Sequence, residues 1–477
     1  MVSATIQMDH APSVPAASER RMPHAVVMML LIIVAAVALT YIVPSGEYQR
    51  TSAGLVVPGS YHTIAKDYSG VLTVGAKHDK GVAYPARPVA IVSSIPVGMT
   101  RSAALIFMIL FIGGMFGVLQ QTGALEAGIE RLLVLTRGDV RIVVPVLMIL
   151  LAAGSTFLGL ISEYLVVIPM ALVLSERLGY DALFGTALVT IAAKIGYLTS
   201  VTNPLALAIA QPMVGVPVFS GAGFRAATFV VFLPIGIWYL LRQCRPTHVA
   251  APDDRQGAAA DASRLSGRHR LVLMVLLAAI ATMILGVQRL SWGSSELAAM
   301  YIAVAIAMAV AGRTNSRDAS QAFVRGMQGM MLAGLLVGLA AAVEVILRDG
   351  MILDSIVAYL TRSIEGKPPV IVANLMMLMQ MAIDVFIPST SGKAAVTMPI
   401  LGPIGHLSGV SGQVTVQAFL FGNGLMNTLT PTSGMLLAYL AAGRVSYGQW
   451  IRFILPLAGV LLALCMIALS VGVFVQS

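Results

Sequence analysis

Four clusters of Ser, Thr, Asn, Gly and Pro residues interrupt long apolar runs in this chain of 477 residues. Inside a membrane, irregular backbone persists only around a cavity or a bound solute, because unpaired backbone groups are costly in hydrocarbon. Hydroxyl, amide and carbonyl oxygens suit a hard cation such as Na⁺, and the positive N-terminal end of a half-helix suits a carboxylate. The candidate residues for binding a small-molecule substrate are Ser162, Glu163, Asn203, Ser389, Thr390, Ser391, Lys393, Asn427 and Thr432, and the candidate Na⁺ ligands are Thr199, Ser200, Thr202, Thr428 and Thr430.

A single cluster of this kind is more simply explained as a kink or as a polar contact between helices. These clusters, however, recur in register along the chain. An offset of 230 residues sets Pro169 on Pro399, and an offset of 227 sets Asn203-Pro204 on Thr430-Pro431. A weak repeat of short apolar segments interrupted by Gly and Pro is typical of transporters built from inverted repeats. We therefore favour a binding site over four unrelated kinks.

Ionisable residues also fall within the apolar runs, where a charge is expensive and usually functional. They are Glu163, Lys194, Glu344, Asp384 and Lys393. Glu344 lies near the end of a run and can reach the membrane surface. Asp384 can pair with Lys393, and Lys194 with Glu163. Glu163 and Lys393 each lie six residues before one of the aligned prolines, so the alternative is a solute site with one acidic and one basic end.

The composition excludes a soluble globular protein. Hydrophobic residues make up 58% of the chain and charged residues 11%, against roughly 25% charged in soluble domains. The apolar runs reach the length of about 20 residues that spans a bilayer. The net charge of +9 comes largely from basic residues beside these runs, including six arginines in 242–270. This pattern orients membrane proteins, so we expect the lipid bilayer as a partner and no nucleic acid.

These features predict an all-α polytopic membrane protein with about nine transmembrane helices and two re-entrant hairpins that enter from opposite faces. The run 25–43 is longer than the apolar core of a signal peptide, so we expect it to remain as the first helix, with the N-terminus in the cytoplasm. The expected parts are a disordered cytoplasmic N-terminus (1–23), a first inverted repeat (24–243) with a hairpin at about 142–178, a cytoplasmic linker (244–270), a connecting helix (271–290) and a second inverted repeat (295–477) with a hairpin at about 369–408.

From about residue 90 onward the sequence resembles the YfcC-like branch of the anaerobic C4-dicarboxylate carrier family, within the ion transporter superfamily. The resemblance rests on Gly185, Thr202-Asn203-Pro204, Ala210-Gln211, Val216-Pro217-Val218-Phe219-Ser220-Gly221, Ile387-Pro388-Ser389-Thr390-Ser391-Gly392, Thr397-Met398-Pro399-Ile400 and Pro431-Thr432-Ser433-Gly434. It implies a bacterial inner-membrane protein with a scaffold domain, a moving transport domain, a homodimeric assembly and elevator-type alternating access.

The chain departs from the pattern of that branch at three places. Ser162-Glu163 stands where the family has paired glutamates, Lys393 where it has Gln, and Gly422-Asn423-Gly424 where it has Gly-Asp-Gly. Two acids are lost and one base is gained. A lysine in that hairpin position is similar to aminobenzoyl-glutamate transporters, whose substrate is anionic.

Together these observations predict a secondary active transporter of a small carboxylate-bearing solute, either a C4-dicarboxylate or an amino-acid-like molecule. We expect coupling to Na⁺ or H⁺ and no cofactor. One alternative is a basic amino acid antiporter of the arginine/ornithine type.

The alternative from another class is an intramembrane enzyme. Tyr180-Asp181 matches half of the signature of intramembrane aspartyl proteases, but the Gly-x-Gly-Asp partner is missing, since Gly422-Asn423-Gly424-Leu425 lacks the acid. We therefore do not expect an enzyme.

Overall fold

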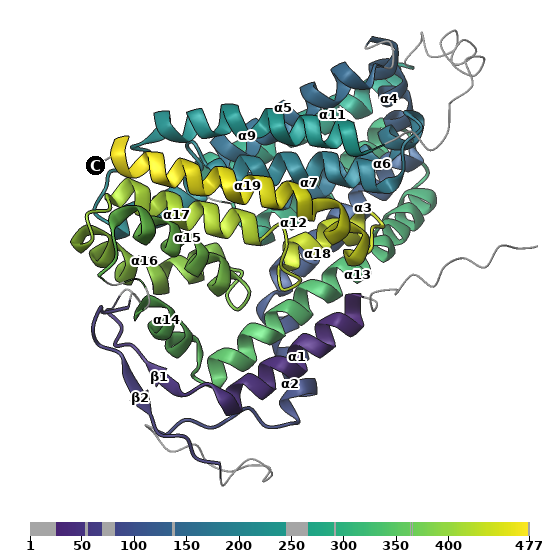
Figure 1. The fold of residues 1–477 in the computed structure, drawn as a ribbon. Coiled ribbons are helices and arrows are strands. Elements are labelled where there is room, and N and C mark those ends of the chain that lie inside the picture. Colours follow the sequence, from purple (N-terminus) through teal and green to yellow (C-terminus); the bar gives the residue numbers. More distant parts are fainter. Residues whose placement is uncertain are drawn as a thin grey trace, which may run out of the picture.

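The computed structural model describes residues 25–52, 56–68, 82–135, 139–244, 266–290, 292–362, 364 and 366–475. The expected N-terminal segment 1–23 and most of the expected linker 244–270 lie outside these ranges. Within them the chain is mostly helical (Figure 1). Eight helical stretches of the described residues are long and apolar enough to cross a membrane, with α7 and α8 counted as one stretch. This multi-pass helical architecture agrees with the sequence-based expectation.

Most of the described residues lie in helices of very different length. In chain order they are α1 (Ala25–Ile42), α2 (Ala90–Arg101), α3 (Ala103–Gln121), α4 (Ala124–Leu135), α5 (Val140–Leu158), the 3₁₀ helix η1 (Ser162–Val166), α6 (Val167–Arg177), α7 (Ala182–Thr199), α8 (Pro204–Met213), α9 (Ala222–Gln243), α11 (Gly267–Leu290), α12 (Ser294–Ala311), α13 (Ser316–Asp349), α14 (Leu353–Arg362), α15 (Pro369–Asp384), α16 (Thr390–Leu407), α17 (Gly412–Met426), α18 (Gly434–Ala442) and α19 (Tyr447–Val475).

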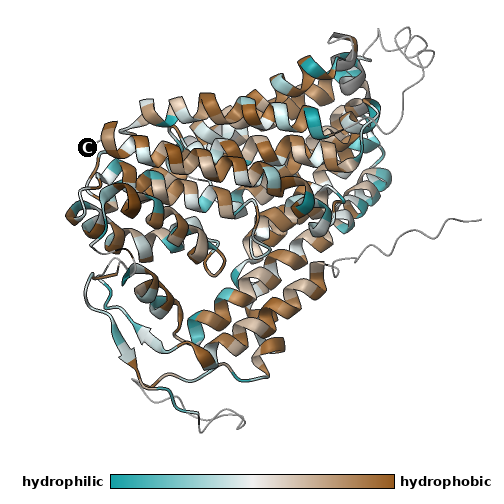
Figure 2. Ribbon diagram, viewed as in Figure 1, coloured by the Kyte–Doolittle hydropathy of each residue, from teal (hydrophilic) through white to brown (hydrophobic). Residues whose placement is uncertain are grey.

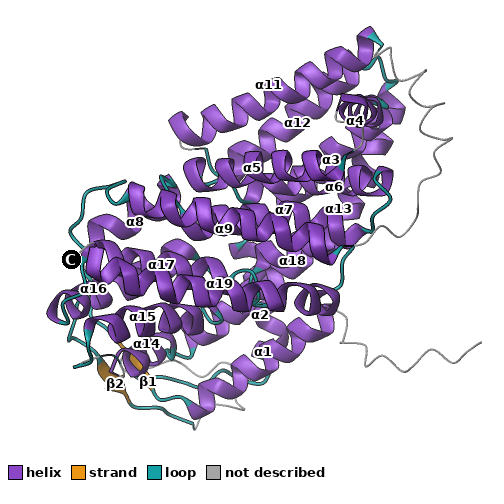
Figure 3. Ribbon diagram, turned by 45° about the horizontal axis from the view of Figure 1, so that its top comes forward, coloured by secondary structure: helices purple, strands orange, loops and turns teal. Residues whose placement is uncertain are grey.

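Two helical hairpins each turn back within the helical layer. The first hairpin consists of α5, η1 and α6, and the second of α15 and α16. Gly159 ends α5 in the left-handed conformation (φ 76°), which glycine adopts without steric cost. α6 lies at the end of the molecule that carries α4, and α16 lies at the opposite end (Figures 1 and 3). The hairpins therefore extend from opposite ends.

Two further helices are broken by local chemistry. The first break comprises residues 200–203, between α7 and α8. Ser200 is left-handed (φ 41°), Asn203 accepts hydrogen bonds from the next turn, and Pro204 opens α8. The second break comprises residues 427–433, between α17 and α18, where Ser433 caps α18. Each break combines a helix stop with a new helix start.

The packing of hairpins and broken helices follows one rule in both halves. The first hairpin's α5 packs along α7, and the second hairpin's α15 packs along α17. After each break the chain then crosses to the other half: α8 packs on α16, and α18 packs on η1 and α6. Around this unit, α13 packs against α1, α2, α3 and α18. Hydrophobic residues run along the helices, whereas hydrophilic residues gather near the strands and at helix ends (Figure 2).

The expectation of an all-α chain is wrong for the loop after α1. Strand β1 (Ser45–Glu47) pairs antiparallel with β2 (His62–Ile64). Asp354 of α14 fixes this small sheet, because its carboxylate accepts hydrogen bonds from the Tyr48 backbone and, at 2.9 Å, from the Arg50 guanidinium. Helix α2 in the same loop was also not predicted, because Pro96 and two serines interrupt its apolar pattern.

Candidate functional site

A buried ion pair lies at the turn of the second hairpin. Asp384 is the last residue of α15 and Lys393 lies in the first turn of α16, so the hairpin brings them together. The Lys393 ammonium lies 2.5 Å from the Asp384 carboxylate, and both side chains are fully buried. The ammonium also donates to the Gln380 carbonyl and lies 5.6 Å from the centre of the Phe419 ring. Of the two roles considered for Lys393, the structure shows the internal pair.

A second lysine, from the other half of the chain, interacts electrostatically with the same carboxylate. Lys194 of α7 is buried, and the charged group acting on it is Asp384. Within the described residues its ammonium has no hydrogen-bond or ion-pair partner. The expected pair between Lys194 and Glu163 is therefore wrong. Lys194 lies instead beside Gly424, Leu425 and Thr428 of the second half, because α7 packs against α17.

A chain of amides and hydroxyls leads from Asp384 toward the surface of the second hairpin. The Asn427 amide donates to Asp384 at 2.9 Å and to Asn423 at 3.3 Å. Asn423 in turn donates to the Tyr197 hydroxyl and to Thr390, whose hydroxyl lies 2.6 Å from that of Tyr197. We call the five residues Lys194, Asp384, Lys393, Asn427 and Asn423 the Asp384 cluster.

The tip of the second hairpin exposes hydroxyl groups. Ser389 and Ser391 are exposed and Thr390 is half-buried. Ser389 caps α16 by accepting a hydrogen bond from the Gly392 backbone. Between this region and the small sheet lies a cavity of about 450 Å³, whose lining includes Glu47, Arg50, Arg348 and Gly392.

The candidate Na⁺ ligands of the second break converge only in part. The Thr430 and Thr432 hydroxyls lie 2.7 Å apart, and Thr432 donates to the Val385 carbonyl of the second hairpin at 2.8 Å. Thr428 instead donates back to Gly424. Among the described residues no group of three or more His, Cys, Asp or Glu could hold a metal ion. Hydroxyl and carbonyl oxygens are therefore the available cation ligands.

The candidate residues of the first break contact the first hairpin rather than the Asp384 cluster. The Thr199 hydroxyl lies 3.1 Å from that of Thr156, and Thr202 donates to the Phe157 carbonyl. Ser200 donates to Tyr197, and the Asn203 side chain accepts from Leu205 and Ala206, which makes it a helix cap.

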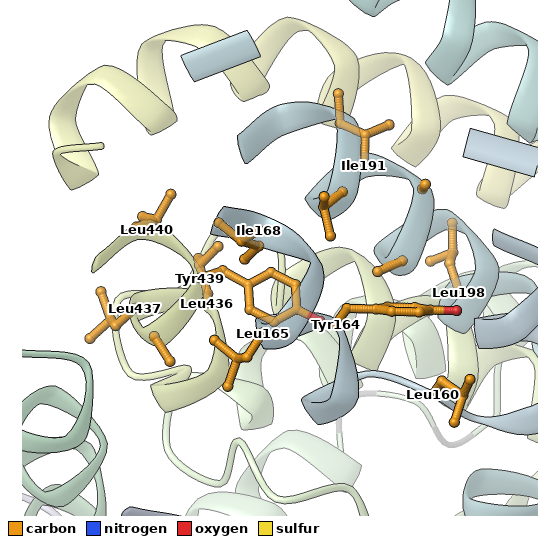
Figure 4. Packing of buried hydrophobic residues seen from close by; sticks show 14 of the residues in the cluster. Leu160, Tyr164, Leu165, Ile168, Ile191, Leu198, Leu436, Leu437, Tyr439 and Leu440 are labelled. Carbon is orange, nitrogen blue, oxygen red and sulfur yellow. The ribbon is translucent and has the colours of Figure 1, made fainter. Parts of the chain in front are cut away.

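Glu163 lies apart from the basic residues. Its carboxylate accepts a hydrogen bond from the Ile161 backbone at 2.9 Å, and it lines an otherwise largely apolar cavity of about 680 Å³. Ser162 is half-buried beside it. Tyr439 of α18 donates to the Ile161 carbonyl, and its ring packs among Leu165 and Ile168 of the first hairpin (Figure 4). The acidic and basic ends expected for one site thus have separate surroundings.

Sequence reasoning missed two members of the polar network. Tyr197 lies in an apolar helix, where a tyrosine does not stand out from the hydrophobic residues around it. Asn423 was considered only as a departure from the family pattern. The available signal was the spacing of Asn423 and Asn427, four residues apart, which places both amides on one face of a helix.

Comparison with known proteins identifies the family. The profile of the family described as "C4-dicarboxylate anaerobic carrier" matches residues 22–474, nearly the whole chain. The protein belongs to this family. A protein of Escherichia coli K12, YfcC, whose name proposes basic amino acid antiport, is 31% identical over 76% of this chain and 75% of its own length. An uncharacterized protein of Haemophilus influenzae is 27% identical over 95% of this chain and 97% of its own.

Two solved transporter structures are also similar to this carrier-family member, each with 18% identity and a TM-score of 0.43. They are the YdaH transporter of Alcanivorax borkumensis, matched over 94% of this chain and 98% of its own, and MtrF of Neisseria gonorrhoeae, described among antimetabolite efflux pumps and matched over 96% of each chain.

Proposed function

We propose that this protein is a secondary active transporter of a small carboxylate-bearing solute, with the Asp384 cluster at the base of its binding site. The observation that carries the proposal is the excess of positive charge in the cluster, which has two lysines and one carboxylate. Two buried lysines share one carboxylate: Lys393 pairs with Asp384 directly, and Lys194 interacts with it electrostatically. A buried charge without a counter-charge is costly, so this part of the protein favours an anionic solute.

The exposed hydroxyls of the second hairpin provide the contact surface for that solute. Ser389 and Ser391 lie at the N-terminal end of α16, where the backbone N–H groups favour a negative charge. Lys393 lies one turn further into the helix and adds a full positive charge beneath them. A carboxylate at this end would therefore interact with hydroxyls, a helix N-terminus and the excess charge of the cluster.

The packing described above supports an inverted-repeat transporter with alternating access. Each half supplies one hairpin and one broken helix. The second part of each broken helix packs on the hairpin of the other half. In the elevator mechanism we propose, these elements move as a transport domain against a scaffold that includes α3 and α13. By family resemblance, we propose a homodimer in the bacterial inner membrane, and the distribution of basic residues favours a cytoplasmic N-terminus.

Cation coupling is proposed from the oxygen-rich second break. Thr430, Thr432 and the Val385 carbonyl form a compact set of ligands suited to Na⁺. Thr430→Ala should weaken Na⁺-dependent uptake. Uptake that ignores Na⁺ but collapses with the proton gradient would assign the coupling to protonation instead, with Glu163 or Asp384 as the proton carrier.

Basic amino acid antiport, suggested by the name of the Escherichia coli relative, is the second candidate. Glu163 favours it, because its buried carboxylate has no cation within ion-pair distance in the described chain. Asp384, the other buried acid, is already paired with Lys393. Glu163→Gln should abolish transport of arginine or ornithine and leave dicarboxylate transport intact.

Uptake into proteoliposomes tests the proposal. Lys393→Gln should raise the half-saturating concentration of a dicarboxylate about ten- to a hundredfold, the value of a charge-assisted hydrogen bond. Arg452→Gln is the matched control, since it removes a basic charge from an exposed position on α19. If Lys393→Gln leaves the affinity for every transported solute unchanged, Lys393 serves only as the partner of Asp384.

Topology is tested by cysteine labelling in sealed cells. Ser52 lies exposed beside the small sheet and Ser266 lies exposed at the start of α11. Cysteines at these positions, in a background without the free Cys244 and Cys465, should label from outside and inside respectively. Labelling of both from one side would contradict the proposed orientation.

A further inference from the structure

A buried arginine bonds to the carbonyl that the first helix break leaves free. Arg225 of α9 is 1% exposed. Its guanidinium donates to the Val201 carbonyl through Nε and Nη2, both at 3.2 Å. Nη2 also donates to the carbonyls of Ser220 at 2.8 Å and Phe219 at 3.4 Å. In the described part of the chain no carboxylate lies within ion-pair distance of Arg225, so backbone carbonyls alone balance its charge.

The second break uses a neutral donor at the corresponding carbonyl. The offset of 227 residues that aligns the two breaks sets Val201 on Thr428 and Arg225 on Arg452. The Thr428 carbonyl accepts a hydrogen bond from the Trp450 indole at 2.9 Å. Arg452 is exposed. The two halves therefore place a donor from the following helix on matching carbonyls, but only the donor in the first half carries a charge.

We propose that the guanidinium of Arg225 takes the place of a bound cation at the first break. A coupling cation then binds only at the second break. The proposal deepens the cation coupling proposed above and rests on it for its second part. Two observations support it. A guanidinium on the Val201 carbonyl repels a metal ion from the same oxygen. The corresponding Thr428 carbonyl of the second break accepts a hydrogen bond from the neutral Trp450 indole, which exerts no such repulsion.

The second break combines a neutral donor with a pair of hydroxyls. Thr430 and Thr432 contact each other, and Thr432 contacts the carbonyl of Val385, the residue that follows Asp384. A cation there would meet hydroxyl and carbonyl oxygens rather than a guanidinium. The asymmetry assigns Arg225 a positioning role, because it acts on the backbone of the first break and on cation selectivity rather than on the solute.

Na⁺-dependent stabilisation of the purified full-length protein tests the inference without requiring a known solute. Thermal unfolding is measured in NaCl and in choline chloride at equal ionic strength, for Arg225→Gln and for its matched control Arg452→Gln, each with and without Thr430→Ala. We expect Thr430→Ala alone to remove the Na⁺ response. Arg225→Gln should restore it in the Thr430→Ala background, with Na⁺ affinity at the first break increased by roughly tenfold or more, whereas Arg452→Gln should not.

Arg225→Lys covers the case in which Arg225→Gln does not fold, because it keeps the charge and a donor. Combined with Thr430→Ala it should show no Na⁺ response. The inference is overturned if the double variant Arg225→Gln/Thr430→Ala folds but shows no Na⁺ response. It is also overturned if Arg225→Lys gains the same response as Arg225→Gln. A Na⁺ response that persists in Thr430→Ala and is removed by a further substitution of Thr199 or Thr202 would overturn it as well. If the unfolding temperature of the wild-type protein is the same in NaCl and in choline chloride, Na⁺ coupling at the second break is contradicted. The Na⁺ response of Arg225→Gln in the Thr430→Ala background reports on the first break alone.

Discussion

Neutralising Asp384 should destabilise the protein more than any other single change in its cluster. Asp384 and Lys393 are both fully buried, and removing one partner of a buried pair costs about 3–5 kcal/mol. Asp384→Asn leaves two buried lysines without a counter-charge. Lys393→Gln is milder, because Asp384 keeps the Asn427 donor and the charge of Lys194. Its cost should be about 1–3 kcal/mol, the value of one lost charged hydrogen bond.

Thermal unfolding in detergent gives the assay. At about 2–4 °C per kcal/mol, Asp384→Asn should lower the midpoint by at least about 6 °C. The control is Glu344→Gln, which breaks a partly exposed helical pair with Arg348 worth about 0.3–0.5 kcal/mol. The expected order of destabilisation is Asp384→Asn, then Lys393→Gln, then Glu344→Gln. An Asp384→Asn protein as stable as Glu344→Gln would refute the buried pair and the charge count that rests on it.

Three further predictions concern single contacts and use the same unfolding assay. Gly159→Ala should cost about 2–3 kcal/mol, from the left-handed backbone and the loss of the Asn203 cap, because an added Cβ would lie 2.5 Å from the side-chain amide oxygen of Asn203. Gly223→Ala, with open space around it, is the control and should be neutral or slightly stabilising. Equal losses of stability in the two variants would contradict the contact with Asn203. Trp450→Phe should cost about 1–3 kcal/mol by leaving the Thr428 carbonyl without its donor, and an unchanged midpoint would mean that this hydrogen bond is absent. Lys194→Met should leave stability unchanged or raise it, since the buried ammonium has no hydrogen-bond partner among the described residues, yet lower uptake of anionic solutes; a large loss of stability would show that Lys194 is a structural cation.

Much of the fold could be predicted from the sequence because its signals are local. Pro204 begins α8 and Asn203 caps it, since proline and asparagine impose these conformations through their own covalent structure. The first membrane helix, expected at 25–43, is α1 (Ala25–Ile42), because hydrophobic length alone decides which segments can span a bilayer. The pairing of Asp384 with Lys393 was also among the expectations, because the two residues lie only nine positions apart across one hairpin turn.

The partners of the remaining polar groups depended on tertiary structure. Glu163 and Lys194 lie only 31 positions apart, yet Lys194 faces Asp384 because α7 packs against α17, on a side of the helix that the sequence does not reveal. Arg225 and Arg452 occupy equivalent sequence positions, and only packing buries the first against Val201 while leaving the second exposed. Local propensity determines where helices start, break and end. Which charge meets which carboxylate or carbonyl is decided by how those helices pack, because a buried charge interacts mainly with the groups that tertiary contacts bring next to it.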